Sequence, residues 1–474
     1  MERPSSLPFQ PSRDRKAYTP SRARPGTGKP VALRVAGQPC RFPGQPRARD
    51  RQPGDAAFEV ERSAMATWNS GRASRRTFLG SAGATLIGAG TTLAGRTPRL
   101  EASQAAPQPH KKEVKLRMAV VGGGFGATFH WHEHPHCEVT AVTDLRADRR
   151  QKLVDHYGCL RVYTSMEEML KTARGSFDAV AIFTEAPNHA RHVLACFEAG
   201  KHVVSACPVA TSLEDLHRIK EAKERTGLRY MMAESSYYRQ ECIAARELFQ
   251  KGEFGRLLYS EVEYYHPGIG ARRDAYSWYN GQRTWRHGYP PMLYPTHSLG
   301  FLVGVTRERI VKVSCQGQLV GDFPAGQENA YDNPFNNEMA LGRTNQNNTC
   351  RFGVFWQVAA SGERAQWLGE KMSCYMASSG GQPASRTVAG QPSRPWEVPE
   401  YWKTEALPPE MRHKSGHGGS AVFLSAEFVN ALIEKREPTV DLYESIAMTA
   451  PGIVAHQSAQ RDGELIDVPS FDKA

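Results

Sequence analysis

The chain has 474 residues, of which 40% are apolar and 23% are charged, an ordinary composition for a globular protein with room for two domains. Its net charge of +11 lies within residues 1–110, which carry 18 basic and 7 acidic side chains, and the remaining residues are balanced. Phosphate recognition needs Lys and Arg clustered on a folded surface. A neutral folded part therefore argues against nucleic-acid binding.

The nine cysteines include no C-x-x-C pair and show no Cys/His spacing typical of metal ligands. Their number is odd, which also does not favour a framework of paired cysteines. We therefore expect no metal site, zinc included, and no disulfide framework.

Residues 1–64 are rich in Arg, Pro, Gly and Gln and are expected to be disordered, because they cannot bury enough apolar surface. Residues 65–106 are expected to form an export signal and a linker. Ser74–Gly80 (S-R-R-T-F-L-G) resembles the twin-arginine (Tat) signal S-R-R-x-F-L-K, with Gly in place of the usual Lys. The apolar stretch that follows, Ser81–Leu93, is too short to predict a membrane-spanning helix.

Counted from Met65, the arginine pair falls at positions 11 and 12, which is usual for such a signal, so we expect Met65 to be the true start. A weak cleavage site lies near residues 103–105. We expect the Tat machinery to export the chain, leaving it periplasmic or tethered to the membrane by an uncleaved signal.

A buried strand is predicted over residues 114–121, and it runs into Gly-Gly-Gly-Phe-Gly-Ala at 122–127. In this G-x-G-x-x-A pattern Gly122 permits a tight turn and Gly124 lets the backbone approach a pyrophosphate, while Ala127 allows close packing of a helix. We expect this loop, with Phe125 and Gly126, to hold the phosphates of a dinucleotide at a helix N-terminus.

A second apolar run, residues 139–143, ends at Asp144, 22 residues after Gly122. This interval matches the acid that binds the adenosine ribose, which favours NAD. Arg146 could instead accept a 2′-phosphate, so NADP stays open. Asp144 could also serve only as a helix cap.

Strands continue to alternate with helices through the first half of the chain. Strands are predicted at 177–183, 201–205 and 229–232, and helices at 188–199 and 212–226. This spacing indicates an α/β fold with a doubly wound parallel sheet, and we assign residues 113–236 to an NAD(P)-binding Rossmann domain.

The segment Ala199–Ala210 (A-G-K-H-V-V-S-A-C-P-V-A) resembles the A-G-K-H-V-x-x-E-K-P-x-A motif of the Gfo/Idh/MocA oxidoreductases. This resemblance implies a carbohydrate substrate, and it implies cofactor contacts from Thr184, His189 and Pro208. The motif's lysine, which assists hydride transfer in the family's dehydrogenases, is replaced by Cys207, and a thiol has neither its fixed charge nor its reach. We expect Cys207 only to pack beside Pro208.

Six further segments resemble the NAD-dependent glycoside hydrolases, the α-N-acetylgalactosaminidase-like branch of this family, which also lacks the lysine. They are Trp285-Arg286, Leu293–Gly300 (L-Y-P-T-H-S-L-G), Glu234–Tyr238, Lys251–Gly255, Asn333–Glu338 and His417–Gly419.

The resemblance implies a cycle without net redox change: oxidation of a sugar hydroxyl at C3, elimination, addition of water and re-reduction. It implies that His297 serves the hydroxyl and the ketone, that Tyr238 acts near C2, and that Tyr294 orients the substrate. Histidine suits proton exchange near neutrality, whereas tyrosine would need a lowered pKa to act as a base. Trp285, Arg286 and His417 are expected to contact the substrate. We expect His297 to lie in a polar break in the chain.

Residues 237–474 are expected to form a second α+β domain with a mostly antiparallel sheet for substrate contact and, as the family implies, for homo-oligomer formation. Strands are predicted at 257–265 and 351–356, a long loop at 376–418, and helices at 421–434 and 442–461.

Two alternatives to the redox-neutral cycle stay open. The chain could be a net sugar dehydrogenase, or an NAD-containing sugar-binding protein without catalytic activity. Export favours the redox-neutral cycle, because free NAD is scarce outside the inner membrane and such an enzyme regenerates its own cofactor.

Overall fold

The computed structural model describes residues 116–268, 277–318, 329–378 and 380–473, all within one compact unit. The predicted disordered segment and Tat signal, Met65 and Cys40 lie outside the described residues. No helix among those described is both long and apolar enough to cross a membrane.

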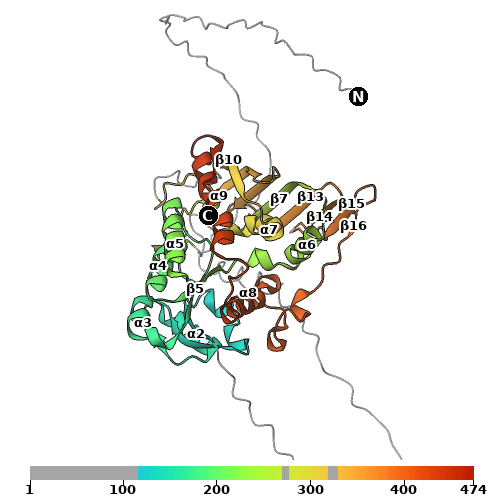
Figure 1. The fold of residues 1–474 in the computed structure, drawn as a ribbon. Coiled ribbons are helices and arrows are strands. Elements are labelled where there is room, and N and C mark those ends of the chain that lie inside the picture. The colour runs from blue at the N-terminus through green and yellow to red at the C-terminus, as the bar shows by residue number, and fades with distance from the viewer. Residues whose placement is uncertain (1–115, 269–276, 319–328, 379, 474) are drawn as a thin grey trace, which may run out of the picture. The chain divides into compact units, whose positions relative to one another are not determined.

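The first half of the described chain forms a parallel sheet of six strands in the order β3-β2-β1-β4-β5-β6 (Figure 1). This is the strand order of a dinucleotide-binding Rossmann fold, which confirms the predicted doubly wound sheet. The strands are nearly continuous apolar runs because helices cover both faces of such a sheet. They are β1 (Leu116–Val121), β2 (Cys137–Thr143), β3 (Val162–Tyr163), β4 (Ala179–Ile182), β5 (His202–Ser205) and β6 (Tyr230–Met232).

Four α-helices connect these strands: α2 (Ala147–Tyr157), α3 (Met166–Thr172), α4 (His189–Glu198) and α5 (Leu213–Thr226). Ser212 caps α5, since its Oγ accepts a hydrogen bond from the backbone N–H of Asp215, and Gly227 ends the helix in the left-handed conformation. Figure 1 shows α4 and α5 next to each other beside the sheet. The helices predicted at 188–199 and 212–226 are confirmed.

The connection from β1 to β2 differs from the prediction. No α-helix follows the glycine turn in residues 122–136; two short 3₁₀ helices, η1 (Gly126–Thr128) and η2 (Trp131–Glu133), stand there instead. The expected helix N-terminus for the phosphates is therefore absent from this segment. With five polar or charged side chains in the seven residues His130–His136, the segment lacks the periodic apolar stripe of a buried helix.

The second half forms a nine-stranded sheet in the order β16-β15-β14-β13-β7-β12-β11-β10-β17, in which only β7 and β12 pair in parallel. This confirms the predicted mostly antiparallel sheet. Buried and exposed residues alternate along β11, as expected for a sheet with one packed face. The strands are β7 (Leu257–Tyr265), β10 (Ile310–Gln318), β11 (Asn337–Thr344), β12 (Thr349–Phe355), β13 (Gly362–Gly369), β14 (Met372–Tyr375), β15 (Ser385–Val388), β16 (Arg394–Pro395) and β17 (Ile466–Asp467).

The long loop predicted at 376–418 is wrong in part, because β15 and β16 extend the sheet there by pairing outward from β14. Gly, Pro and Ser dominate this segment and hide the strand pattern, since its edge strands are short and mostly exposed. The segment also contains the 3₁₀ helices η7 (Tyr401–Lys403) and η8 (Pro409–Met411), and a separate hairpin joins β8 (Trp278–Tyr279) to β9 (Gln282–Arg283).

Helix α7 (Thr296–Thr306) is buried along nearly its whole length. It packs against β7, against α6 (Gln240–Gln250) and against the 3₁₀ helix η5 (Ser235–Tyr238). Such a helix is apolar all round because it has no solvent-facing side. Its Gly300 lies against Glu234, where an added Cβ would come within 3.2 Å of the Glu234 Cγ, so the helix can approach this carboxylate closely.

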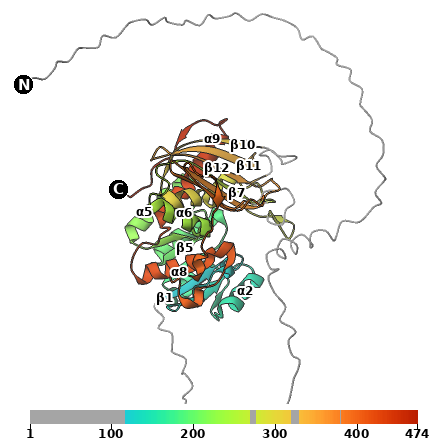
Figure 2. The ribbon, with the colours of Figure 1, turned by 90° about the vertical axis from the view of Figure 1, so that its right-hand side faces the viewer.

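The two C-terminal helices, α8 (Gly416–Ile433) and α9 (Leu442–Ala459), confirm the predicted helical segments and contact the six-stranded sheet. Helix α8 contacts β1 and η2, and Figure 2 shows it beside the blue β1. Glu437 pairs with Lys223 and Arg229. Residues 237–474 were predicted to form a separate second domain. Their C-terminal helices also cover the nucleotide-binding domain, at the place where the connection from β1 to β2 lacks an α-helix.

Candidate active site

His297 stands in the first turn of α7, directly after Pro295 and Thr296, and only 8% of it is exposed. The predicted polar break is therefore wrong, because the polar residues around His297 begin a buried helix. The ring is held among Tyr294 of the same motif and groups from three other segments of the chain: Glu234, Cys207 and Tyr264.

Glu234 is fully buried, and its Oε1 lies 2.7 Å from Nδ1 of His297. The same oxygen accepts a hydrogen bond from the backbone N–H of Ser236. Burial alone would raise the pKa of Glu234, but the neighbouring His297 holds it down at about 2. Burial would lower the pKa of His297, and the Glu234 carboxylate raises it well above its ordinary value. The two side chains form a buried ion pair.

Cys207 follows β5 and places its Sγ 3.6 Å from Nε2 of His297 and 3.9 Å from the Tyr294 hydroxyl. The expectation that Cys207 only packs beside Pro208 is therefore wrong. Nδ1 of His297 faces a carboxylate and Nε2 faces a thiol, so both ring nitrogens have polar neighbours. Cys207 is buried, with 4% of its surface exposed.

Two tyrosines flank the His297 ring. The ring centroid of Tyr264 lies 4.6 Å from that of His297, and the centroid of Tyr294 lies 5.3 Å away. Burial and the nearby Cys207 raise the pKa of Tyr294 to about 12, and burial also raises the pKa of Tyr264. Both hydroxyls are therefore protonated near neutral pH and can donate hydrogen bonds.

His417 lies close enough to His297 for the charge of His297 to lower the pKa of His417. Burial, and then the charges of His297 and Arg239, lower the pKa of His417 to about 4, so it is neutral at pH 7. His417 and the two glycines after it adopt positive φ, and a Cβ on Gly418 would lie 2.0 Å from Nη1 of Arg239. Arg239 in turn pairs with the buried Glu363 at 2.7 Å.

The predicted substrate-binding pair also reaches this cluster. The guanidinium of Arg286 lies 4.3 Å from the ring centroid of Trp285 and 5.8 Å from that of Tyr294. Trp285 packs edge-on against Tyr289. The structure therefore places a cation that is stacked on Trp285 next to Tyr294.

Tyr238 lies elsewhere. Its ring stacks on Phe423 of α8, with centroids 5.8 Å apart and an interplanar angle of 4°. Burial, and then Glu427, raise the pKa of Tyr238, which is the opposite of what a tyrosine base needs. No described contact joins it to His297, so the geometry does not support the predicted role near C2. Tyr238 serves the packing of α8 instead.

The glycine turn has the shape that a dinucleotide needs. Gly122 has φ +99°, and a Cβ there would lie 2.2 Å from the carbonyl oxygen of Phe183. A Cβ on Gly124 would meet only the Arg149 side chain, at 3.5 Å. Nothing in the protein therefore requires glycine at 124, and the open space fits the close approach of a pyrophosphate.

Asp144 supports this turn from the end of β2. Its Oδ2 accepts a hydrogen bond from the backbone N–H of Gly123 (2.7 Å), and its Oδ1 accepts one from that of Arg146 (2.8 Å). Each carboxylate oxygen keeps a lone pair for a ribose hydroxyl. The Arg146 guanidinium is held by Asp148 and lies 4.0 Å from the Tyr279 ring centroid. Arg146 is thus already paired, which favours NAD over NADP.

His189 joins the other two predicted cofactor residues. Its Nδ1 lies 2.7 Å from the carbonyl oxygen of Pro208, and its Nε2 lies 3.1 Å from that of Thr184. The Thr184 hydroxyl contacts His192. Pro208 and Thr184 follow β5 and β4, so His189 ties together two loops at the carboxyl edge of the parallel sheet, where cofactors bind in this fold.

Phe125 connects the turn to the residues around His297, because its ring packs edge-on against His417 at 5.0 Å. The next two residues, Gly126 and Ala127, are buried, and a Cβ on Gly126 would lie 2.9 Å from the Phe183 ring. These two predicted cofactor residues therefore support the turn from its buried side by packing inside the protein.

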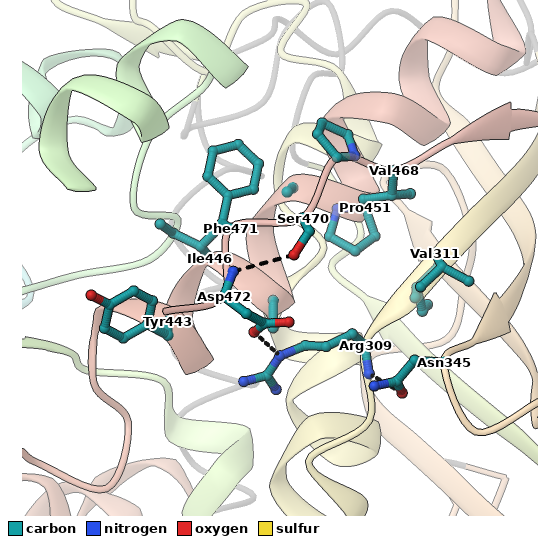
Figure 3. Close-up of a pocket in the computed structure, with 14 residues that line it drawn as sticks. Arg309, Val311, Asn345, Tyr443, Ile446, Pro451, Val468, Ser470, Phe471 and Asp472 are labelled. Carbon is teal, nitrogen blue, oxygen red and sulfur yellow. Dashed lines mark hydrogen bonds and ion pairs between the residues drawn. The ribbon is translucent and has the colours of Figure 1, made fainter. Parts of the chain in front are cut away.

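A cavity of about 240 Å³ lies apart from these residues, between α9 and the C-terminal segment (Figure 3). Its wall includes Arg309, whose guanidinium is already paired with Glu444 and Asp472. Pro451, Val468 and Phe471 supply apolar surface. None of the predicted site residues lines this cavity.

Sequence reasoning missed the partners of His297. Glu234 stands in a segment that points to the glycosidase branch, but nothing in the sequence pairs it with a histidine 63 residues away. Tyr264 and Glu363 lie on strands and look like ordinary sheet residues. Cys207 carried a usable signal, since it occupies the position of the family's lysine.

Two known families match separate parts of the chain. Residues 116–234 match the oxidoreductase family with the NAD-binding Rossmann fold, Gfo/Idh/MocA. Residues 392–474 match the C-terminal domain of glycosyl hydrolase 109.

Similar proteins are named as family 109 glycosyl hydrolases or as an alpha-N-acetylgalactosaminidase. A glycosyl hydrolase family 109 protein of Streptomyces coelicolor is 25% identical over 84% of this chain and 94% of its own length. An alpha-N-acetylgalactosaminidase of Shewanella oneidensis is 30% identical over 48% of this chain and 53% of its own length.

Solved structures share the fold. Levoglucosan dehydrogenase in complex with NADH and levoglucosan has a TM-score of 0.61 at 15% identity, covering 75% of this chain and all of that chain. The WlbA dehydrogenase of Bordetella pertussis, in complex with NADH and UDP-GlcNAcA, has a TM-score of 0.59 at 19% identity, covering 76% and 99%.

Proposed function

Because this chain is an NAD-binding enzyme of the Gfo/Idh/MocA family with a glycosyl hydrolase 109 C-terminal domain, we propose that it cleaves glycosides by a redox-neutral cycle. The glycine turn and Asp144 would hold tightly bound NAD⁺, whose chemistry would be the reversible acceptance of a hydride, here from C3 of the sugar. The residues around the glycine turn fit this cofactor, since Gly124 leaves its approach open and Asp144 faces the turn.

The observation that carries the proposal is the buried Glu234–His297 pair with Cys207 at Nε2. The raised pKa of His297 means that the ring must first lose its Nε2 proton. In this deprotonated form the Nδ1 proton is directed at Glu234, and Nε2 accepts the proton of the C3 hydroxyl. The Glu234 carboxylate stabilises the imidazolium that forms. The Nε2–H of this imidazolium then donates a hydrogen bond to the C3 ketone oxygen. One side chain thus serves both the hydroxyl and the ketone.

The neighbours of His297 hold the sugar in this proposal. The protonated hydroxyls of Tyr294 and Tyr264 donate hydrogen bonds, and Arg286 stacked on Trp285 supplies a cation and an apolar surface. His417, neutral at pH 7, stands between the glycine turn and His297 and contacts the substrate beside the cofactor.

The substrate class follows from the relatives. One relative is named as an alpha-N-acetylgalactosaminidase, and several others as family 109 glycosyl hydrolases. We therefore take an α-linked N-acetylgalactosaminide as the first substrate to test.

The test uses p-nitrophenyl N-acetyl-α-galactosaminide and related aryl glycosides, with no cofactor added and the protein's own NAD content measured first. We expect release of nitrophenol by the wild type, and its loss in His297→Ala with NAD content unchanged. Cys196→Ala, a small truncation in the core of the nucleotide-binding domain, is the control for general destabilisation. Reduction of added NAD by a free sugar would instead establish a net dehydrogenase. Bound NAD without either reaction would leave a sugar-binding protein.

Export is part of the proposal and rests on Arg75 and Arg76. Tat carries folded proteins, so the cofactor can be loaded before export, and a redox-neutral cycle then needs no external NAD. Replacing both arginines by lysine should keep the precursor in the cytoplasm, as measured by cell fractionation. Unchanged export of that variant would refute the assignment.

We also propose that the chain forms homo-oligomers through the open face of the nine-stranded sheet. Met339 and Leu341 of β11 are 41% and 54% exposed on this face. Light scattering on the purified protein, with Leu341→Glu as the variant, tests this surface.

A further inference from the structure

The segment after the glycine turn has an unusual composition. Residues 130–136 read H-W-H-E-H-P-H, with four histidines and one glutamate in seven positions. This segment stands where the first crossover helix of the fold was expected. The mechanism proposed above uses none of these side chains.

Two of these residues meet a histidine from far along the chain. His130 Nδ1 lies 2.8 Å from Oε1 of Glu133, and His413 Nε2 lies 2.7 Å from Oε2 of the same carboxylate. The two imidazole rings are 4.9 Å apart, and one ligand-type atom from each of the three residues lies within 4.8 Å of the others. We call His130, Glu133 and His413 the His-Glu-His cluster.

We propose that the His-Glu-His cluster binds one divalent transition-metal ion, with zinc as the best match. Two imidazole nitrogens and one carboxylate oxygen are a ligand set that zinc and its neighbours accept, whereas magnesium and calcium prefer oxygen ligands alone. The three side chains are 15%, 25% and 40% exposed, so an ion can enter and water can complete its coordination. The proposal departs from the expectation of no metal, which considered only spacing along the sequence.

The position of the cluster indicates what the ion would do. His413 precedes His417 by four residues, and His417 packs on Phe125 of the glycine turn. On the other side, the backbone N–H of His130 donates a hydrogen bond to Ser425 of α8. A bound ion would therefore fasten the start of α8 to the segment that follows the glycine turn. The ion would have a structural role beside the glycine turn, at a site separate from the Glu234–His297 pair.

Without metal, the same three groups form a hydrogen-bonded triad in which each carboxylate oxygen faces one imidazole. A metal needs the lone pair of both facing nitrogens, so each ring must be neutral and carry its proton on the other nitrogen, and binding must weaken at acid pH. Simple hydrogen bonding would show no metal uptake at any pH.

The experiment uses untagged, full-length protein stripped with a chelator and titrated with Zn²⁺ by calorimetry at neutral and at acid pH. We expect one ion per chain, weaker binding at acid pH, a Zn²⁺-dependent rise in Tm and no such rise with Mg²⁺. Glu133→Gln and His413→Ala should each weaken binding by at least about tenfold. His136→Ala, from the same segment but outside the cluster, should bind like the wild type.

A second set of ligand-type atoms, Cys207, Glu234 and His297, could hold an ion instead, and Cys207→Ser separates the two sites. Loss of binding in Cys207→Ser with retention in Glu133→Gln would overturn the proposal. Failure of the wild type to bind Zn²⁺ would overturn it as well. It would also be overturned if Glu133→Gln and His413→Ala both bound Zn²⁺ with the affinity of the wild type. The nearly isosteric Glu133→Gln keeps the test valid if the alanine variant does not fold. Glycosidase activity plays no part in this readout, so the result is independent of the proposed function.

Discussion

Nδ1 of His297 lies 2.7 Å from Oε1 of Glu234, and both side chains are buried. A buried carboxylate at this distance fixes the orientation of the ring and makes the imidazole a stronger base. Replacing Glu234 by Gln keeps the shape and removes the charge. We expect kcat to fall on the order of 10²-fold or more with NAD content unchanged, as measured by nitrophenol release and by absorbance of the extracted cofactor.

The same variant predicts a change in pH dependence. In the wild type the pKa of His297 is raised, and activity needs the deprotonated ring, so the rate increases as pH rises through that pKa. Without the carboxylate the pKa falls, because burial then dominates. The acidic limb of the kcat profile should therefore move to lower pH in Glu234→Gln, although its plateau is lower. A limb that stays in place or moves to higher pH would contradict the assignment of His297 as the base.

Cys207 provides a second prediction, because its Sγ is the neighbour of Nε2 at 3.6 Å. Cys207→Ala removes this neighbour and leaves a small gap, and we expect kcat to fall by roughly tenfold while the NAD content stays constant. Cys196→Ala makes a similar gap in the Rossmann core and should leave kcat unchanged. Equal losses in the two variants would assign Cys207 to packing alone.

The glycine turn allows folding and cofactor binding to be separated. Gly122→Ala requires φ +99° and meets the Phe183 carbonyl at 2.2 Å, so it should lower the free energy of unfolding by more than about 1 kcal/mol. Gly124→Ala has room in the protein, and it should fold normally yet bind NAD at least about tenfold more weakly. Thermal unfolding and NAD titration distinguish the two. Normal NAD affinity in Gly124→Ala would place the pyrophosphate elsewhere.

Tyr238 is the residue for which sequence and structure disagree most clearly. Its ring stacks on Phe423, and no described contact joins it to His297. Tyr238→Phe should therefore retain activity within about twofold, since it removes only a hydroxyl that lies away from the reacting atoms. Tyr264→Phe, beside His297, is the matched variant and should lose more. A large loss in Tyr238→Phe alone would restore its catalytic role.

Much of the nucleotide-binding half could be predicted because its signals are local. The glycine turn, the strand that ends at Asp144 and the helix over 212–226 each depend on neighbouring residues. His297 and Tyr294 could be named for the same reason, since they stand together in one motif.

The rest depends on tertiary contacts that span long stretches of the chain. Glu234 and Glu363 meet His297 only because α7 packs between η5 and the large sheet. The absence of the first crossover helix also depends on a distant contact, because α8, almost 300 residues later, covers that part of the sheet. His413 joins His130 across the same long interval.

The most direct test of the central claim is cleavage of an aryl N-acetyl-α-galactosaminide in D₂O, followed by mass spectrometry and NMR of the released sugar. Oxidation at C3 makes the C2 proton exchangeable, so the redox-neutral cycle predicts one solvent deuterium at C2 of the product and no accumulation of NADH. Deuterium at C2 of the wild-type product, together with loss of cleavage in His297→Ala, would support the account. Cleavage without any deuterium at C2 would contradict it, because the bond would then break without a C3 ketone.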